Sequence, residues 1–292
     1  MQRNLQSRSV LRIYPHWFYI PAALIFGVFF LVPTALAFYF SMTRWTLFDA
    51  TFIGFDNYIT FLSDRMLTTG LRNTIIYAVL TSGLKTVIAL PLATLLTSGI
   101  RLKGLFRGII FFPVLVSTIA VGITFSALMQ PSMGLINVTQ GFFGLPQPDW
   151  LGNPSLALYS VALVDVWKGL GIATVIFMAG IVSIPQEYFD VASLEGGASV
   201  RFRHVILPLA RNSTFTVILL SFIGGLRSFD LIWAMTRGGP GFASDVLTSV
   251  IYKQYQAGFY GLSTAGNVVL FILVTVIVYP LMRYFNRMEI EL

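Results

Sequence analysis

The sequence predicts an all-α integral membrane protein, a bundle of six transmembrane helices with a polar helical insert between the fourth and fifth. Hydrophobic residues occupy 56% of the 292 positions, and charged residues only 11%. The mean hydropathy is +0.78, well outside what an average soluble domain shows. Six apolar stretches can each cross a hydrocarbon core of about 30 Å, which takes about 20 residues. We therefore expect a single transmembrane domain over residues 1–292.

The expected spans are runs of apolar residues separated by more polar connections. Their approximate bounds are 17–41, 73–97, 108–130, 155–183, 213–235 and 263–285. A basic N-terminal segment precedes the first run, but that run is too long for the core of a signal peptide, so we interpret it as a retained span. Prolines inside the spans predict kinks, because neighbouring helices can satisfy the freed carbonyl groups.

Basic residues in the connections predict the orientation of the bundle. With a cytoplasmic N-terminus, eleven lysines and arginines fall on the inside and five on the outside. The inside set is Arg3, Arg8, Arg12, Arg101, Lys103, Arg107, Arg201, Arg203, Arg211, Arg283 and Arg287. The outside set is Arg44, Arg65, Arg72, Arg237 and Lys253. Because cytoplasmic loops carry the excess of basic residues, we expect a multi-pass protein of the cell membrane with both termini, and the loop 184–212, in the cytoplasm.

Several functional classes are disfavoured by the residues themselves. The chain has no cysteine, so it has neither a disulfide nor a thiolate metal site. It has no Gly-Lys-Ser/Thr after a glycine-rich loop and no HExxH arrangement, so we expect no nucleotide, metal or catalytic site in this chain. The net charge of +7 fits membrane topology, and we expect no nucleic-acid partner.

The connection between the fourth and fifth spans is the longest charged segment between two apolar runs. Its Pro185 suits the first turn of a helix, where the missing N–H costs nothing. We predict a helix from about Pro185 to Leu194 that ends at Gly196 and Gly197, which can take the left-handed conformation. A second short helix is expected to end before Pro208.

This connection resembles the EAA loop of ABC-importer permeases, whose pattern is roughly Glu-Ala-Ala, three residues, Gly, nine residues and Ile-x-Leu-Pro. Here Asp190-Val191-Ala192 and Gly196 take the first positions, and Val205-Ile206-Leu207-Pro208 the last, one residue early. The segments 52–58, 150–154 and 236–241 also resemble carbohydrate-uptake permeases, so the resemblance covers nearly the whole chain. It implies contact with an ATPase through Glu187, Asp190, Val191, Ala192, Glu195, Gly196 and Gly197.

The resemblance also implies a fold, partners and a substrate. The fold is that of type I ABC-importer permeases, of the first-permease type similar to maltose, glycerol-phosphate and multiple-sugar permeases. The implied partners are a second homologous permease, two ATPase subunits inside, a solute-binding protein outside, membrane lipid and a sugar. ATP and Mg would be bound by the ATPase, so no cofactor is expected in this chain.

A sugar would lie midway through the membrane in such a permease. Small residues follow one predicted face of the fifth span, which more often indicates tight helix packing than a binding site. The resemblance favours a binding site, because a sugar needs hydroxyls, backbone groups and an apolar face. It implies a substrate path of Trp167, Lys168, Gly169, Ile172, Ser221, Gly225 and Ser228.

Charges inside spans are unfavourable by about 2.5 to 3.5 kcal/mol each, so each needs a partner or water. Asp165 and Lys168 are three residues apart, as are Arg227 and Asp230, and we predict that each pair meets on one helix face. Lys85 has no local partner and would snorkel or pair with another helix. A structural role and a role in the path both remain open, and the cations would also suit an anionic substrate.

The sequence thus predicts a permease subunit of an ATP-driven, binding-protein-dependent importer for a sugar or oligosaccharide. The same class could import another solute, such as glycerol phosphate, a polyamine or a phosphonate. A stand-alone secondary transporter would need inverted halves or a relay of carboxylates, and only Asp165 and Asp230 lie within spans. An integral membrane enzyme would need a His or carboxylate cluster, which the sequence does not provide.

Overall fold

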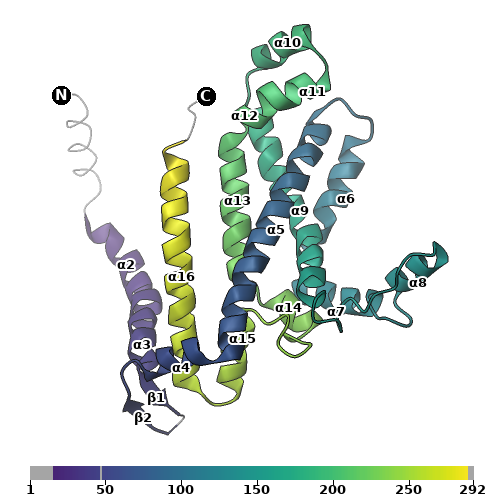
Figure 1. The fold of residues 1–292 in the computed structure, drawn as a ribbon. Helices are drawn as coiled ribbons and strands as arrows, with labels where there is room; N and C mark the ends of the chain where they lie inside the picture. The colour runs from purple at the N-terminus through teal and green to yellow at the C-terminus, as the bar shows by residue number, and fades with distance from the viewer. Residues whose placement is uncertain (1–15, 47, 289–292) are drawn as a thin grey trace.

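The computed structural model describes residues 16–46 and 48–288 as a bundle of long helices that run roughly side by side (Figure 1). Four helices could cross a membrane unbroken: Trp17–Ser41, Arg65–Thr97, Ala157–Val182 and Tyr260–Phe285. Two bent pairs bring the number to as many as six. Within these residues the only sheet is a two-stranded hairpin, so the all-α class is confirmed. The basic Arg3, Arg8 and Arg12 lie outside the described residues, and the single domain over 1–292 stays a prediction.

The first span lies at the edge of the bundle. It comprises η1 (His16–Tyr19), α2 (Ile20–Phe26), η2 (Gly27–Leu31) and α3 (Val32–Ser41), with the bounds that the sequence predicted. It packs against the last span, α16 (Tyr260–Asn286). The hairpin β1 (Thr43–Trp45) and β2 (Ala50–Phe52) and the helix α4 (Asp56–Ser63) follow at the lower end in Figure 1. Asn57 ties these segments together, because its amide donates to the carbonyls of Ser41 and Thr43.

Three helices form the centre of the bundle: α5 (Arg65–Thr97), α9 (Ala157–Val182) and α13 (Arg211–Leu226), with α5 packed against both others. The helix α5 begins earlier than the predicted residue 73, because the Asp64 carboxylate caps it by accepting the N–H groups of Met66 and Leu67. The added turns are polar, which explains why hydropathy alone missed them. Close packing depends on small residues: Gly225 of α13 faces the α5 backbone at Ala78.

The third predicted span, 108–130, is not one straight helix. It divides into α6 (Lys103–Leu115) and α7 (Thr118–Leu128), whose axes differ by 100°. Pro113 lacks the N–H that would continue the helical ladder, and Val116 and Ser117 then leave the helical conformation. The chain after the bend carries α8 (Leu135–Phe142) out to the side of the bundle (Figure 1).

The predicted fifth span, 213–235, is broken as well. The helix α13 ends at Leu226, and α14 (Asp230–Met235) begins after three non-helical residues. The adjacent Gly224 and Gly225 weaken the last turn of α13. The Thr248 hydroxyl, at the start of α15 (Leu247–Gln256), donates to the Ser228 carbonyl at 2.5 Å and holds the break in place.

The predicted insert forms the upper end of the molecule in Figure 1, as α10 (Gln186–Glu195), α11 (Ala198–Val200), η3 (Arg201–Ile206) and α12 (Leu207–Leu209). Two details of the prediction are wrong. Gly196 ends α10 with an extended backbone, φ 169°, rather than a left-handed one. The second helix continues through Pro208 to Leu209, because Pro208 lies in the first turn of α12, where its missing N–H costs nothing.

Candidate functional site

The helix α10 attaches to the molecule by one face and leaves another face free. Ala192 is only 5% exposed and packs with Ile184 and Val205. On the other side Val191 is exposed, and Leu194 is 88% exposed at the outer end of the bundle. Ala192 therefore stabilises the loop itself, whereas Val191 and Leu194 are available to another surface.

A groove of about 440 Å³ runs between α10 and η3. Four of the seven predicted coupling residues line it, namely Glu187, Val191, Ala192 and Glu195. Asp190 lies outside the groove, where its carboxylate accepts the Gln186 amide at 3.1 Å. Gly196 faces the Val200 side chain, and Gly197 is open to its surroundings. The structure thus brings the predicted residues onto one short, mainly acidic helix and its C-terminal turn.

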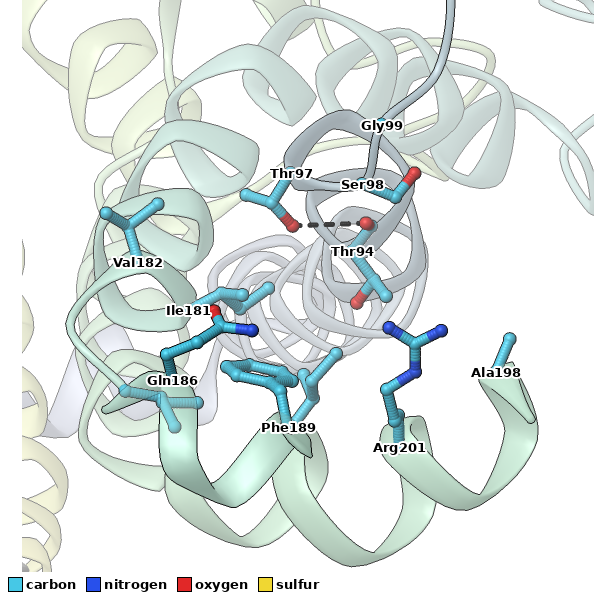
Figure 2. Close-up of a pocket in the computed structure, with 12 residues that line it drawn as sticks. Thr94, Thr97, Ser98, Gly99, Ile181, Val182, Gln186, Phe189, Ala198 and Arg201 are labelled. Carbon is cyan, nitrogen blue, oxygen red and sulfur yellow. Dashed lines mark hydrogen bonds between the residues drawn. The ribbon is translucent and has the colours of Figure 1, made fainter. Parts of the chain in front are cut away.

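A cavity of about 540 Å³ separates α10 from the ends of α5 and α9. Figure 2 shows Gln186, Phe189 and Arg201 around this space, with Thr94 and Thr97 of α5 opposite them. The Thr97 hydroxyl is turned back onto its own helix, where it donates to the Thr94 carbonyl at 3.1 Å. Phe189 nevertheless packs against the buried cluster that α5 and α9 form, so the cavity leaves only part of the boundary between α10 and α5 unfilled.

A partly buried ion pair joins the two central helices. Lys85 of α5 donates to the Asp165 carboxylate of α9, with Nζ and Oδ2 2.8 Å apart. The predicted pairing of Asp165 with Lys168 is therefore wrong, and Lys168 forms no ion pair within the described residues. Gly169 makes the contact possible: a Cβ there would lie 2.5 Å from the Lys85 Cε.

The second predicted pair is also wrong. No ion pair joins Arg227 and Asp230 in the described part of the chain. Helical i, i+3 geometry does not apply to them, because α13 ends at Leu226 and Arg227 already lies in its C-terminal cap. Asp230 is instead the first residue of α14, where the positive end of the helix dipole stabilises its negative charge.

The predicted substrate path divides into exposed and packed positions. Trp167 and Ile172 are exposed on α9, and the Trp167 ring lies 5.1 Å from the Phe125 ring of α7. Gly225 is buried, and a Cβ there would lie 2.6 Å from the Ala78 Cα. Ser221 is half-buried on α13, while Ser228 lies beyond its end, so the predicted continuous stripe is interrupted.

A second ion pair, which the sequence did not reveal, lies near the lower end of the bundle. The buried Asp245 carboxylate accepts hydrogen bonds from Lys253 at 2.6 and 2.9 Å and from the Ser249 hydroxyl at 2.8 Å. Burial raises the pKa of Asp245, and the contacts with Lys253 and Ser249 oppose that rise. Gly238, at φ 84°, must lack a side chain, because a Cβ would overlap the Asp245 carboxylate. In the sequence, the glycine-rich turn that begins at Gly238, ahead of Asp245, was the feature that could have indicated this site.

The spans, their two breaks and the protruding α10 define the permease class of ABC importers. The chain superposes with a TM-score of 0.81 on a chain from a crystal structure of a bacterial ABC transporter involved in the import of the acidic polysaccharide alginate. The two share 20% identity, and 99% of each is covered. Residues 85–289 match the family described as "Binding-protein-dependent transport system inner membrane component". The chain belongs to this family.

Similar permeases align with almost the whole length of this chain. The trehalose/maltose transport system permease protein MalF of Thermococcus litoralis is 30% identical, over 92% of this chain and 92% of its own. The sn-glycerol-3-phosphate transport system permease protein UgpA of Agrobacterium fabrum is 29% identical, over 94% and 93%. These relatives are transport permeases rather than enzymes. Within the described residues no group of His, Asp and Glu could hold a metal ion.

Proposed function

We propose that this chain is one of two permease subunits in an ATP-driven importer that moves a sugar or oligosaccharide across the cytoplasmic membrane. The observation that carries the proposal is the family match combined with 30% identity to a trehalose/maltose permease over 92% of the chain. Permeases for diacetylchitobiose and arabino-oligosaccharides are similar to it as well. Import of a glycerol phosphate is the second candidate, supported by the likeness to UgpA.

The proposed partners are a solute-binding protein outside, a second permease beside this chain and two ATPase subunits inside. The exposed face of α10, with Val191 and Leu194 among acidic side chains, supports docking of this helix on an ATPase. ATP and Mg would be bound by the ATPase subunits, and this chain would contribute no cofactor site.

The orientation proposed for the bundle places α10 and both termini in the cytoplasm. The loop between α5 and α6, which carries Arg101, and Lys103 at the start of α6 lie at the same end of the bundle as α10 (Figure 1). Arg201 and Arg203 lie in η3 at that end too. This concentration of basic residues is what the cytoplasmic side of a membrane protein shows.

The mechanism follows from how α10 connects to the centre. Movement of the ATPases on ATP binding would displace α10, and the helix Ala198–Leu209 would pass the displacement to α13 through the 66° bend between them. The Lys85–Asp165 pair would keep α5 and α9 moving together. The break after Leu226 would then open or close the path near Ser228, so that the bound solute faces one side at a time.

Uptake into proteoliposomes tests this function directly. Vesicles containing the purified importer should accumulate labelled oligosaccharide only with ATP inside and the binding protein outside. Leu194→Asp should reduce uptake and ATPase stimulation by more than about tenfold, because a charge would enter the docking surface. Leu102→Asp, at an exposed leucine of the same end, should have little effect. Uptake by this chain alone, driven by an ion gradient, would contradict the proposal.

A further inference from the structure

An open groove of about 460 Å³ lies between α6 and α9, beside the end of α5. Its lining is mainly apolar and includes Leu96 of α5, Arg107, Gly108 and Phe111 of α6, and Gly171 and Met178 of α9. The helices α5 and α9 are candidate spans, and α6 is the first half of a bent one. The groove therefore lies among segments that cross the membrane.

Arg107 stands at the end of the groove that faces the same way as α10 (Figure 1). One of its Nη atoms donates to the Leu96 carbonyl at 3.3 Å. This carbonyl belongs to the last turn of α5, where the negative end of the helix dipole favours a cation. The other N–H groups of this exposed guanidinium donate to no acceptor within the described residues. Arg107 is thus held in position while most of its donors are free for a ligand.

Beyond Arg107 the groove continues along an apolar face of α9. From Met178 to Gly171 it follows two turns of that helix, which is about 10 Å. Gly108 keeps the groove open, because a Cβ there would meet nothing within 4 Å. A helix of another chain, about 10 Å across, would occupy about 800 Å³ over this length and could enter the groove only in part. A flexible acyl chain can follow it.

The charges along the sequence at this end are all positive. Lys103 lies one turn before Arg107, and Arg101 comes just before α6. Residues 65–148 contain no Asp or Glu, and none of the three cations forms an ion pair in the part of the chain that the structure describes. A basic cluster beside an apolar groove between spans is complementary to an amphiphile with an anionic head.

We propose that this groove binds an anionic phospholipid, whose phosphate lies at Arg107 and whose acyl chain follows α9 toward Gly171. The inference goes beyond the proposed function, because it holds whichever solute the importer moves. It also makes no use of the exposed face of α10.

Lipid binding to the purified, assembled importer in detergent tests the head of this site. In native mass spectrometry, phosphatidylglycerol should bind at least about tenfold more tightly than phosphatidylcholine, whose choline offsets the phosphate charge. Arg107→Gln should remove this preference, and Arg107→Lys should keep most of it. The matched control is Arg203→Gln, at an exposed basic residue of η3, which should leave the preference unchanged. Equal binding of both lipids to the wild type, or an unchanged preference in Arg107→Gln, would overturn the inference.

A steric variant tests the apolar part of the site without a change of charge. Gly108→Leu should fill the groove and weaken phosphatidylglycerol binding about tenfold, and the open space at Gly108 allows the variant to fold. Gly83→Leu, at a glycine of α5 that is equally open but does not line the groove, should bind the lipid normally. If Gly108→Leu binds the lipid like the wild type, or if inorganic phosphate binds as tightly as the lipid, the site holds a soluble anion and the inference fails.

Photocrosslinking in the native membrane distinguishes lipid from protein in the groove. Benzoylphenylalanine in place of Phe111, which is 38% exposed, should form an adduct with a phospholipid. Adducts with another protein chain alone would overturn the inference. None of these measurements depends on uptake, so their failure would leave the proposed function intact.

Discussion

At the scale of single residues, the Asp245–Lys253 pair makes stability depend on pH. Because burial raises the pKa of Asp245 in the folded protein, the native state binds this proton more tightly than the unfolded chain. Stability from this group is therefore full below the unfolded carboxyl pKa of about 3.9 and declines as the pH rises through the folded value. Lys253 limits that decline by compensating the buried charge.

Removal of Lys253 should expose this dependence. Lys253→Met should destabilise the protein by about 3 to 5 kcal/mol at pH 8, because an unpaired buried carboxylate remains. At pH 5 the loss should be smaller, since the pKa of Asp245 rises further and the group is more fully protonated. Thermal unfolding in detergent at the two pH values measures the difference. Adding Asp245→Asn should remove the pH dependence, and an equal loss at both pH values in the single variant would contradict the assignment.

The charged residues also show where prediction from sequence stops. That a charge lies within a span is visible in the sequence, and the expectation that it needs a partner was correct for Lys85 and Asp165. The partner itself could not be read from spacing, because it lies on another helix. Nearest-neighbour spacing favoured Lys168, whereas the side-chain-free surface at Gly169 directs Lys85 to Asp165.

At the scale of elements, the two adjacent glycines of α13 allow packing and substrate binding to be separated. A Cβ at Gly225 would meet the α5 backbone at Ala78, whereas a Cβ at Gly224 would meet nothing within 4 Å. Gly225→Ala should therefore cost about 1 to 3 kcal/mol through overpacking. Gly224→Ala should be neutral or stabilising by up to about 1 kcal/mol, because alanine favours the helix.

Unfolding in detergent and uptake by the same variants check this prediction. If Gly225 is a packing position, loss of uptake in Gly225→Ala should follow loss of stability. Lost uptake with unchanged stability would instead place Gly225 in the substrate path, as the sequence analysis expected.

Element boundaries were predictable where local chemistry determines them. The first span and the helix after Pro185 follow from hydropathy and from a favourable first turn, and both occur close to the predicted positions. A kink at Pro113 was expected, but the full 100° break after Leu115 and the break after Leu226 were not predicted. Both occur inside apolar stretches, where packing of α7 against α14 and the Thr248 contact favour a bend over a straight helix.

At the scale of the whole molecule, the central helices and the outer ones have different environments. The most apolar segments of α5 and α9 are 39% and 44% buried, whereas that of the first span is 0% buried within this chain. Apolar content therefore predicted which segments enter the membrane, but not which of them form the core. The core assignment required the contacts of α5 with α9 and α13, which no clear apolar periodicity in these helices encodes.

The orientation of the whole bundle can be measured with single cysteines, because the chain has none of its own. Leu194→Cys, on α10, and Phe48→Cys, in the hairpin connection, place thiols at highly exposed positions at opposite ends of the molecule. A membrane-impermeant maleimide is added to intact cells, or to spheroplasts if an outer membrane blocks access. It should label the Phe48→Cys variant and leave the Leu194→Cys variant unlabelled. In inverted membrane vesicles prepared without the ATPase subunits it should label Leu194→Cys instead, because the basic residues near α10 hold that end in the cytoplasm. The reverse pattern would place α10 outside, where no ATPase subunit could reach it, and would contradict both the orientation and the coupling role of Leu194.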